Sequence, residues 1–187
     1  MHYITDDFYS IDKIDELIAS GEKVGISESC KNKIEHCASY LKNKLASGNQ
    51  IIYGINTGFG SLCDTVVSNE ELEDLQVNLV RSHACGAGET IPNSIVKRML
   101  LLKAIALSKG HSGVYIETVE RILWLYNHEV LPVIYELGSL GASGDLAPLA
   151  HMSLSLIGEG EVTYKGITRP TVEVFREFDI DPIKLHP

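Results

Sequence analysis

Residues 138–152 read GSLGASGDLAPLAHM, a glycine-rich loop that runs directly into a short apolar helix. Three glycines within residues 138–144 disfavour regular secondary structure, because glycine loses more conformational freedom on ordering than any other residue. Asp145 is placed to cap the N-terminus of the helix, and Pro148 is tolerated in its first turn. We expect the helix to continue to about Ile157.

The tripeptide Ala142-Ser143-Gly144 in this loop has the residue types that a backbone cyclisation requires. If the Gly144 nitrogen attacks the Ala142 carbonyl carbon and the ring loses two water molecules, the Ser143 hydroxyl leaves and its β-carbon becomes an exocyclic methylidene. Glycine supplies an unhindered nitrogen, serine the leaving hydroxyl and alanine an uncrowded carbonyl. The product is an electrophile made from the chain, although the tripeptide alone is more typical of a flexible loop.

Two further segments combine glycines with polar and aromatic side chains. Residues 53–60 read YGINTGFG, and residues 78–88 read NLVRSHACGAG. Taken alone, Tyr53 is more typical of a packed ring at the end of a strand. His83 alone is as typical of a hydrogen-bonded core histidine as of a functional one. Neither segment by itself identifies a function.

Together, the three segments closely resemble the signature of the histidine and aromatic amino-acid ammonia-lyases, in that family's order along the chain. The cofactor of the family is 4-methylidene-imidazole-5-one (MIO), the ring that cyclisation of Ala142-Ser143-Gly144 gives. The resemblance extends over essentially the whole chain. It implies a mainly α fold with a few short strands and a hairpin, in which residues 1–187 are the N-terminal, cofactor-forming domain.

The resemblance implies roles for individual residues. Tyr53 matches the family's catalytic tyrosine, the proposed base that removes the β-proton after the substrate amine has added to the methylidene, so that ammonia departs and a trans-alkene remains. A free tyrosine has a pKa of about 10, so the phenolate needs stabilisation by nearby donors or helix N-termini. A helix that begins at Asp145 directs its positive end at the ring and favours the negative charge that develops there. Gly60 and Asp145 are the expected supporting residues.

The pair Ser82-His83 is expected to bind the substrate. Family members selective for tyrosine tend to carry His-Leu at this pair and those selective for phenylalanine carry Phe-Leu, whereas Ser-His resembles the histidine enzymes. The resemblance therefore favours L-histidine as the substrate, with trans-urocanate and ammonia as products, the first step of histidine degradation. In that role His83 orients the substrate imidazole by hydrogen bonding. A tyrosine or phenylalanine ammonia-lyase or aminomutase is the alternative.

Chains of this family are much longer than 187 residues, and a central long-helix bundle assembles them into a homotetramer that shares each active site among subunits. The bundle and the family's downstream substrate-binding positions are absent here, and residues 181–187 look like a cut rather than a natural end. The isolated chain is therefore alternatively a non-catalytic helical module. We expect its uncovered apolar faces to favour association in solution.

Composition excludes several other classes. A chain of 187 residues with 44% hydrophobic and 22% charged residues is typical of one globular domain. Its net charge of −9 and the lack of a Lys/Arg cluster make nucleic acid and anionic membranes poor partners. The N-terminus has no signal-peptide pattern, and Lys97, Arg98 and Lys103 interrupt the most apolar stretch, at 95–107. We expect a cytoplasmic protein.

Other catalytic and metal-binding motifs are missing. The seven histidines never pair at the i, i+4 spacing of a zinc helix, and no two cysteines form a CxxC pair, so we predict no metal site and reduced thiols at Cys30, Cys37, Cys63 and Cys85. Residues 58–63 and 86–91 supply only the first two glycines of a dinucleotide fingerprint. Ser143 fails the hydrolase Gly-x-Ser-x-Gly pattern because Asp145 occupies the second glycine position.

Apolar spacing predicts helices over most of the remaining chain. These helices are expected at Ser10 to Gly21, Ser27 to Gly48, Ser68 to about Arg81, Pro92 to Gly110, and Val114 to Tyr126, with start or stop signals at Ser10, Gly21, Ser27, Gly48, Ser68 and Pro92. The apolar stripe expected on the Pro92 helix comprises Ile95, Met99, Leu102 and Ile105. A short strand is expected at 50–53, a hairpin around Lys165-Gly166, and a last short helix with Val172, Phe175 and Phe178.

Overall fold

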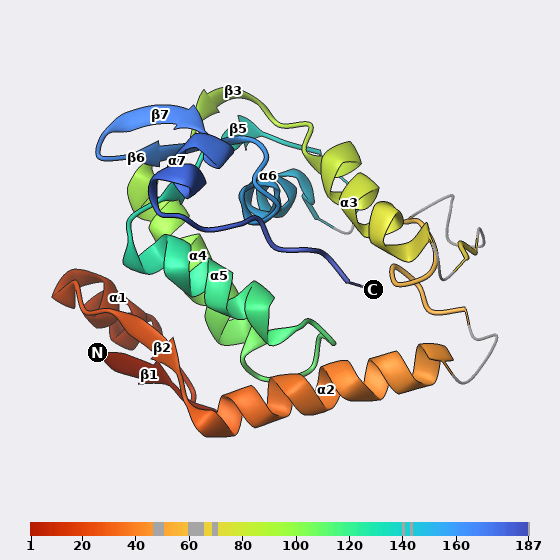
Figure 1. Cartoon of the computed structure of the whole chain (residues 1–187). Helices are drawn as coiled ribbons and strands as arrows, with labels where there is room; N and C mark the ends of the chain where they lie inside the picture. The colour runs from red at the N-terminus through yellow and green to blue at the C-terminus, as the bar shows by residue number, and fades with distance from the viewer. Residues whose placement is uncertain (47–50, 60–65, 69–70, 140, 143, 187) are drawn as a thin grey trace. The chain divides into compact units, whose positions relative to one another are not determined.

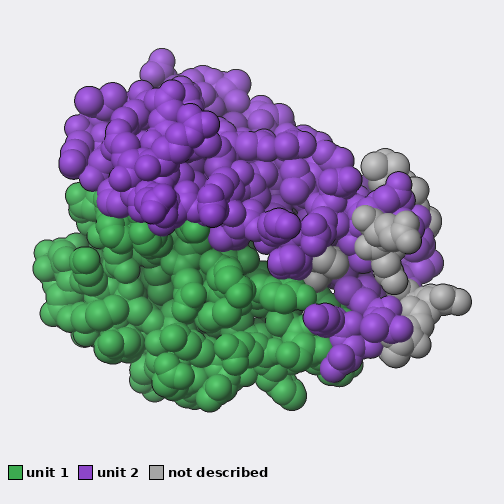
Figure 2. Space-filling view, viewed as in Figure 1, with its two compact units in different colours: residues 1–41, 92–131 green, residues 42–91, 132–187 purple. Residues whose placement is uncertain are grey.

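The computed structural model describes residues 1–46, 51–59, 66–68, 71–139, 141–142 and 144–186. The chain divides into two compact units (Figure 2), of which unit 1 comprises residues 1–41 and 92–131 and unit 2 comprises residues 42–91 and 132–187. In the described part of the chain, no helix combines the length and apolarity that crossing a bilayer requires.

Unit 1 contains a small parallel sheet and helices that pack beside it (Figure 1). Its elements are β1 (His2–Ile4), α1 (Ile11–Ser20), β2 (Val24–Ile26), α2 (Glu28–Ala46, which extends into unit 2), α4 (Asn93–Leu107) and α5 (Ile116–Asn127). β1 and β2 pair in parallel, with His2 opposite Val24 and Ile4 opposite Ile26. Neither strand was predicted from the sequence, because three residues carry too short a pattern to distinguish a strand from a loop.

The predicted ends of the first two helices are confirmed where the structure describes them. Ser10 Oγ accepts the Lys13 N–H at 3.2 Å and caps α1, and Gly21 ends that helix at a φ of 65°, in the left-handed region that glycine adopts without strain. Ser27 Oγ accepts the Cys30 N–H at 3.4 Å at the start of α2. The expected stop at Gly48 lies outside the described residues.

The predicted stripe on α4 is partly wrong. Ile95 and Leu102 are 46% and 43% exposed, whereas the side chains buried from α4 are mainly Val96, Leu100, Leu101 and Ala104. α4 packs on α5 within unit 1, and α5 buries Val119, Ile122, Leu123, Leu125 and Tyr126. Because α4 is apolar on most of its surface, spacing alone does not decide which stripe faces the neighbouring helix.

Unit 2 holds the remaining elements. They are α3 (Leu72–His83), β3 (Ala87–Thr90), β5 (Tyr135–Leu137), α6 (Ala147–Leu156), β6 (Glu161–Tyr164), β7 (Ile167–Pro170) and α7 (Thr171–Glu177). β4 (Leu131–Pro132) lies where the chain passes from unit 1 to unit 2. β3 and β5 pair antiparallel, and α3 packs against α6 (Figure 1). The fold is mainly α with short strands, as predicted.

The predicted hairpin and last helix are confirmed. β6 and β7 pair with Glu161 opposite Pro170, and both turn residues, Lys165 and Gly166, have positive φ, as a two-residue hairpin requires. α7 follows directly and buries Val174 and Phe175.

The strand expected at 50–53 is wrong for its described residues. Residues 53–56 form a turn, in which the Ile55 and Asn56 N–H groups donate to the Ile52 carbonyl. Asn56 Oδ1 in return accepts the Ile52 N–H at 2.8 Å. This side chain therefore competes with a strand for the backbone groups that a neighbouring strand would need.

Asn127 gives a test of the packing in unit 1. Its side-chain amide accepts the Val24 N–H and donates to the Val24 carbonyl, both at 2.8 Å, so it acts as a neighbouring strand for the edge of β2. We predict that Asn127→Ala lowers the free energy of unfolding by about 1 to 3 kcal/mol, because it leaves two backbone groups without partners. Urea unfolding measures the change. Lys13→Ala, which removes an exposed ion pair with Glu16, is the control and should cost less than about 0.5 kcal/mol.

Candidate active site

The loop that precedes α6 contains a tight turn at Gly141–Gly144. The Gly144 N–H donates to the Gly141 carbonyl at 3.2 Å, so the chain reverses within four residues and the Gly144 nitrogen lies close to the start of the tripeptide. Gly144 has a φ of 106°, and no atom lies within 4 Å of the position of a Cβ. Ala142 is exposed, and Ser143 lies outside the described residues. The residues described here fit the cyclisation, because the Gly144 nitrogen is turned back toward the segment that it would attack and the space beside the Gly144 Cα is open.

The Asp145 carboxylate links the beginning of this loop to the helix that follows. Its Oδ1 accepts the Ser139 N–H at 2.8 Å, the Ser139 hydroxyl at 3.1 Å and the Ala147 N–H at 3.0 Å. Partial desolvation raises the pKa of Asp145, but these three hydrogen bonds outweigh it and hold the pKa below its ordinary value of 3.8. A Cβ at Gly138 would lie 2.0 Å from Asp145 Oδ2, so only glycine admits the carboxylate here.

The predicted helix start at Asp145 is wrong by two residues. α6 begins at Ala147, and Leu146 is the residue before it, with helical backbone angles and no capping side chain. Asp145 still reaches the first turn through the Ala147 N–H. The carboxylate therefore accepts hydrogen bonds from both the loop, at Ser139, and the first turn of the helix, at Ala147. A residue that only caps a helix would bond the helix alone. Pro148 lies in the first turn, as predicted.

Tyr53 lies in the turn that opens the YGINTGFG segment. Its side chain is 62% exposed, and its ring centroid is 5.7 Å from that of Phe59. Gly54 has a φ of 70°, and a Cβ there would approach Phe59 to 2.6 Å. Glycine at position 54 therefore allows both the positive φ of the turn and the close approach of the Phe59 ring to the Gly54 backbone. Gly60 lies outside the described residues.

Gln76, on α3, holds this segment in place. Its side-chain amide donates to the carbonyls of Gly54 at 3.3 Å and Ile55 at 3.1 Å. Thr57 is fully buried, and its hydroxyl accepts the Gly54 N–H at 3.2 Å. Sequence reasoning missed Gln76, because a glutamine in the middle of a helix carries no local signal of a long-range contact.

Ser82 and His83 form the end of α3. His83 Nδ1 lies 2.7 Å from the Leu79 carbonyl oxygen, which can only accept, so Nδ1 carries the proton and the neutral ring offers Nε2 as an acceptor. Ser82 Oγ donates to the same carbonyl at 3.1 Å. The Phe59 ring meets the His83 ring edge to face, with centroids 5.2 Å apart. The structure thus brings Tyr53 and His83 together through Phe59, a residue that the sequence analysis did not single out.

The candidate residues form two groups within unit 2. Tyr53, Phe59 and His83 lie at α3 and the segment before it, and the turn with Asp145 precedes α6. The Gly86 N–H, just beyond α3, donates to His151 Nε2 on α6 at 2.9 Å. The packing of α3 on α6 therefore fixes the helices that carry the two groups.

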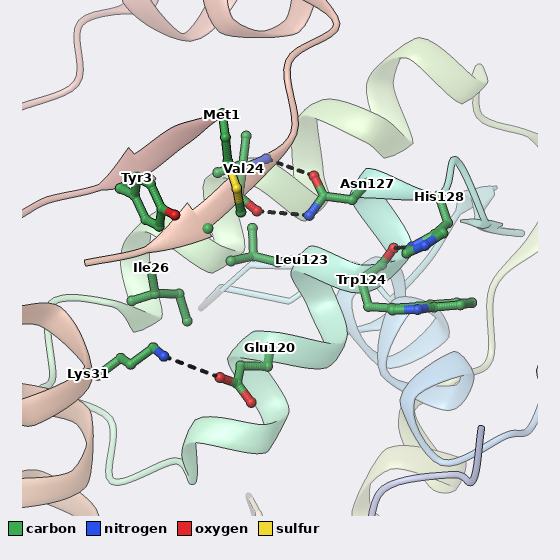
Figure 3. Close-up of a pocket in the computed structure, with 11 residues that line it drawn as sticks. Met1, Tyr3, Val24, Ile26, Lys31, Glu120, Leu123, Trp124, Asn127 and His128 are labelled. Carbon is green, nitrogen blue, oxygen red and sulfur yellow. Dashed lines mark hydrogen bonds and ion pairs between the residues drawn. The ribbon is translucent and has the colours of Figure 1, made fainter. Parts of the chain in front are cut away.

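A pocket of about 310 Å³ lies in unit 1 and contains none of these residues. Figure 3 shows Asn127 bonded to Val24 on one side and Lys31 facing Glu120 on the other, at 3.9 Å. The pocket lies at β2 and α5, and it contains the Asn127 hydrogen bonds to Val24 and the ion pair between Lys31 and Glu120.

A family model described as aromatic amino acid lyase matches residues 9–187. The chain belongs to the aromatic amino acid lyase family. It is 44% identical over 185 residues to the histidine ammonia-lyase of Shouchella clausii, covering 99% of this chain and 37% of that protein. It is 42% identical over 182 residues to that of Deinococcus radiodurans, covering 97% and 34%. The chain thus spans little more than a third of the length of these relatives.

Solved structures of the family share the fold. The histidine ammonia-lyase of Trypanosoma cruzi superposes with a TM-score of 0.81 at 35% identity, over 100% of this chain and 36% of that one. The tyrosine aminomutase of Streptomyces globisporus gives a TM-score of 0.89 at 29% identity, over 99% and 34%. The resemblance inferred from the three segments and the mainly α fold are confirmed.

The lowered pKa of Asp145 predicts a pH dependence of stability. A carboxyl whose pKa is lower in the folded state stabilises the fold above its unfolded pKa, near 3.8, and this contribution is lost as the pH falls through the folded pKa. We expect Asp145→Asn to be less stable than the parent above about pH 5 and the difference to shrink in more acidic solution. Urea unfolding from acid to neutral pH measures it, with Asp181→Asn as the control for removal of an exposed charge. A difference that is constant with pH would contradict the assignment.

Proposed function

We propose that residues 1–187 are the cofactor-forming domain of a histidine ammonia-lyase, which converts L-histidine to trans-urocanate and ammonia. The observation that carries this proposal is the hydrogen bond from His83 Nδ1–H to the Leu79 carbonyl, which leaves Nε2 as an acceptor. An imidazole N–H of the substrate is the complementary donor. The names and identities of the curated relatives support the same substrate.

The chain's own contribution to the cofactor is the cyclisation of Ala142-Ser143-Gly144. The Gly144 nitrogen forms a bond with the Ala142 carbonyl carbon, and two water molecules leave, one with the Ala142 oxygen and one with the Ser143 hydroxyl. The turn closed by the Gly144 N–H and the Gly141 carbonyl supports this step, as does the carboxylate of Asp145 that holds the loop. When formed, the MIO group supplies an electrophile for the substrate amine.

Tyr53 is the proposed base for the β-proton of the substrate. A phenol is a weak base at neutral pH, so a proton transfer to it depends on positioning and on donors near its oxygen. Phe59 contacts the rings of both Tyr53 and His83. In this arrangement His83 orients the substrate ring and Tyr53 takes the proton, and their separation is set by the phenylalanine between them.

A tyrosine ammonia-lyase or aminomutase is the second candidate, favoured by the likeness to the tyrosine aminomutase structure. The acceptor at His83 Nε2 discriminates among the alternatives, because a tyrosine hydroxyl can donate to it and a phenylalanine ring cannot. A phenylalanine ammonia-lyase or aminomutase stays an alternative as well, although its substrate ring offers no donor to His83 Nε2. Turnover of L-histidine against L-tyrosine and L-phenylalanine distinguishes the candidates. The homotetramer implied by the family resemblance stays a prediction.

The intact mass of the purified chain tests cofactor formation. We expect a loss equal to two water molecules if residues 1–187 cyclise unaided. Ser143→Ala should abolish the loss, because no hydroxyl remains to be eliminated. Ser153→Ala, which removes a hydroxyl that donates to the Leu149 carbonyl of its own helix, is the control and should retain the loss. An electrophile that persists in Ser143→Ala would exclude Ser143 as its source.

Tyr53→Phe tests the base in the complete enzyme to which we propose the chain belongs. We expect the mass loss to persist and the formation of urocanate, followed by its absorbance, to fall by about 10²- to 10⁴-fold, the usual contribution of a general base. Tyr40→Phe is a matched control, since Tyr40 is also 62% exposed but lies on α2. Unchanged turnover in Tyr53→Phe would reject Tyr53 as the base.

A further inference from the structure

His151, on α6, is half-buried and has no part in the chemistry proposed above. Its Nε2 accepts the Gly86 N–H at 2.9 Å, and its ring meets the Tyr135 ring edge to face with centroids 5.1 Å apart. A backbone N–H can only donate, so Nε2 is unprotonated and the proton of the neutral ring is on Nδ1. Burial also lowers the pKa of His151, which favours the same neutral form.

Three segments meet at this imidazole. Gly86 follows His83 by three residues, Tyr135 begins the strand that leads into the loop of the cofactor turn, and α6 follows that loop. The approach is close on both sides, because a Cβ at Gly86 would lie 2.9 Å from His151 Nε2 and 3.2 Å from the Tyr135 Cβ. Glycine at 86 is therefore required for the contact with His151.

A second interaction, an ion pair between Arg81 and Glu159, holds the same end of α3. Arg81 Nε donates to Glu159 Oε2 at 3.0 Å and Arg81 Nη2 donates to Oε1 at 2.5 Å, and Glu159 lies just beyond α6. This pair is largely exposed, so its contribution is modest. The hydrogen bond at His151 is less accessible to water. In the sequence, His83 lies between the two residues that make these interactions, Arg81 and Gly86.

We propose that His151 is a positioning residue that fixes His83 relative to the Ala142-Ser143-Gly144 turn. It does so by binding the segment just after His83 to the helix just after the turn. The inference rests on the proposed function, in which His83 orients the substrate. Without the acceptor at 151, the Gly86 N–H loses its partner and the end of α3 can shift from its place on α6. A displacement of about 1 Å in an orienting group is enough to cost a factor of about 10² in rate.

Two replacements of His151 separate positioning from packing. His151→Phe keeps a ring beside Tyr135 and removes the acceptor, whereas His151→Gln offers an amide oxygen close to the place of Nε2. Gly86→Ala disturbs the same hydrogen bond from the other side, with His151 unchanged. His128→Phe is the matched control, since His128 is also half-buried and bonded at Nδ1, to the Trp124 carbonyl, but lies in unit 1.

The experiment measures the intact mass, kcat and KM for L-histidine in the complete enzyme. We expect His151→Phe and Gly86→Ala to raise KM and to lower kcat/KM by about 10- to 100-fold with the mass loss of cyclisation intact, because the half-buried Gly86 N–H loses the acceptor that holds the end of α3 in place. His151→Gln should recover kcat/KM to within about fivefold of the parent, on the same basis of a restored acceptor. His128→Phe should match the parent.

Several outcomes would overturn the inference. Parent-like KM and kcat in His151→Phe would do so, as would a loss of activity that His151→Gln fails to recover. Loss of the mass change in these variants would assign His151 to cofactor formation instead. If His151→Phe does not fold, the kinetics of His151→Gln and Gly86→Ala still test the proposal. A Gly86→Ala variant with the KM and kcat of the parent enzyme would contradict it. Failure of the proposed function looks different, since the unmodified enzyme would then not convert histidine.

Discussion

The carboxylate of Asp145 is the constraint on which the candidate site depends. It lies against Gly138, where any side chain would displace it, and it joins Ser139 at the beginning of the loop to Ala147 at the beginning of α6. The loop is thereby closed at its base, and the turn at Gly144 forms within it. A negative charge that accepts several hydrogen bonds near a helix N-terminus is in a favourable field, so the closure is electrostatically stable at neutral pH.

The aromatic group on α3 depends on contacts of a different kind. Gln76 holds the backbone of the YGINTGFG segment by two hydrogen bonds, and Phe59 then contacts both Tyr53 and His83. The two groups are therefore supported independently, one by the Asp145 carboxylate and the other by the Gln76 amide and the Phe59 ring. Packing of α3 on α6 is what relates them, which gives the hydrogen bond between Gly86 and His151 its importance.

The sequence predicted both ends of α1 and the start of α2, because Ser10, Gly21 and Ser27 act on their nearest backbone groups and need no tertiary partner. It identified the family from three segments, and hence the residues of the candidate site. It did not predict β1 or β2, whose pairing joins residues far apart in the chain, and it placed a strand where Asn56 closes a turn. Gln76, Phe59 and His151 were missed for the same reason, since their importance lies in contacts with distant segments.

Each unit is built from two separated stretches of chain. The second stretch of unit 1 ends at residue 131, whereas the second stretch of unit 2 begins at residue 132. During synthesis from the N-terminus, the segments with Tyr53 and His83 therefore emerge before the strand and helix on which they pack. The tripeptide at 142–144 belongs to the second of the two stretches that form unit 2. The packing of α3 on α6, and with it the hydrogen bond between Gly86 and His151, therefore forms later than the contacts within unit 1, so residues 42–91 wait for their partners while unit 1 can already fold.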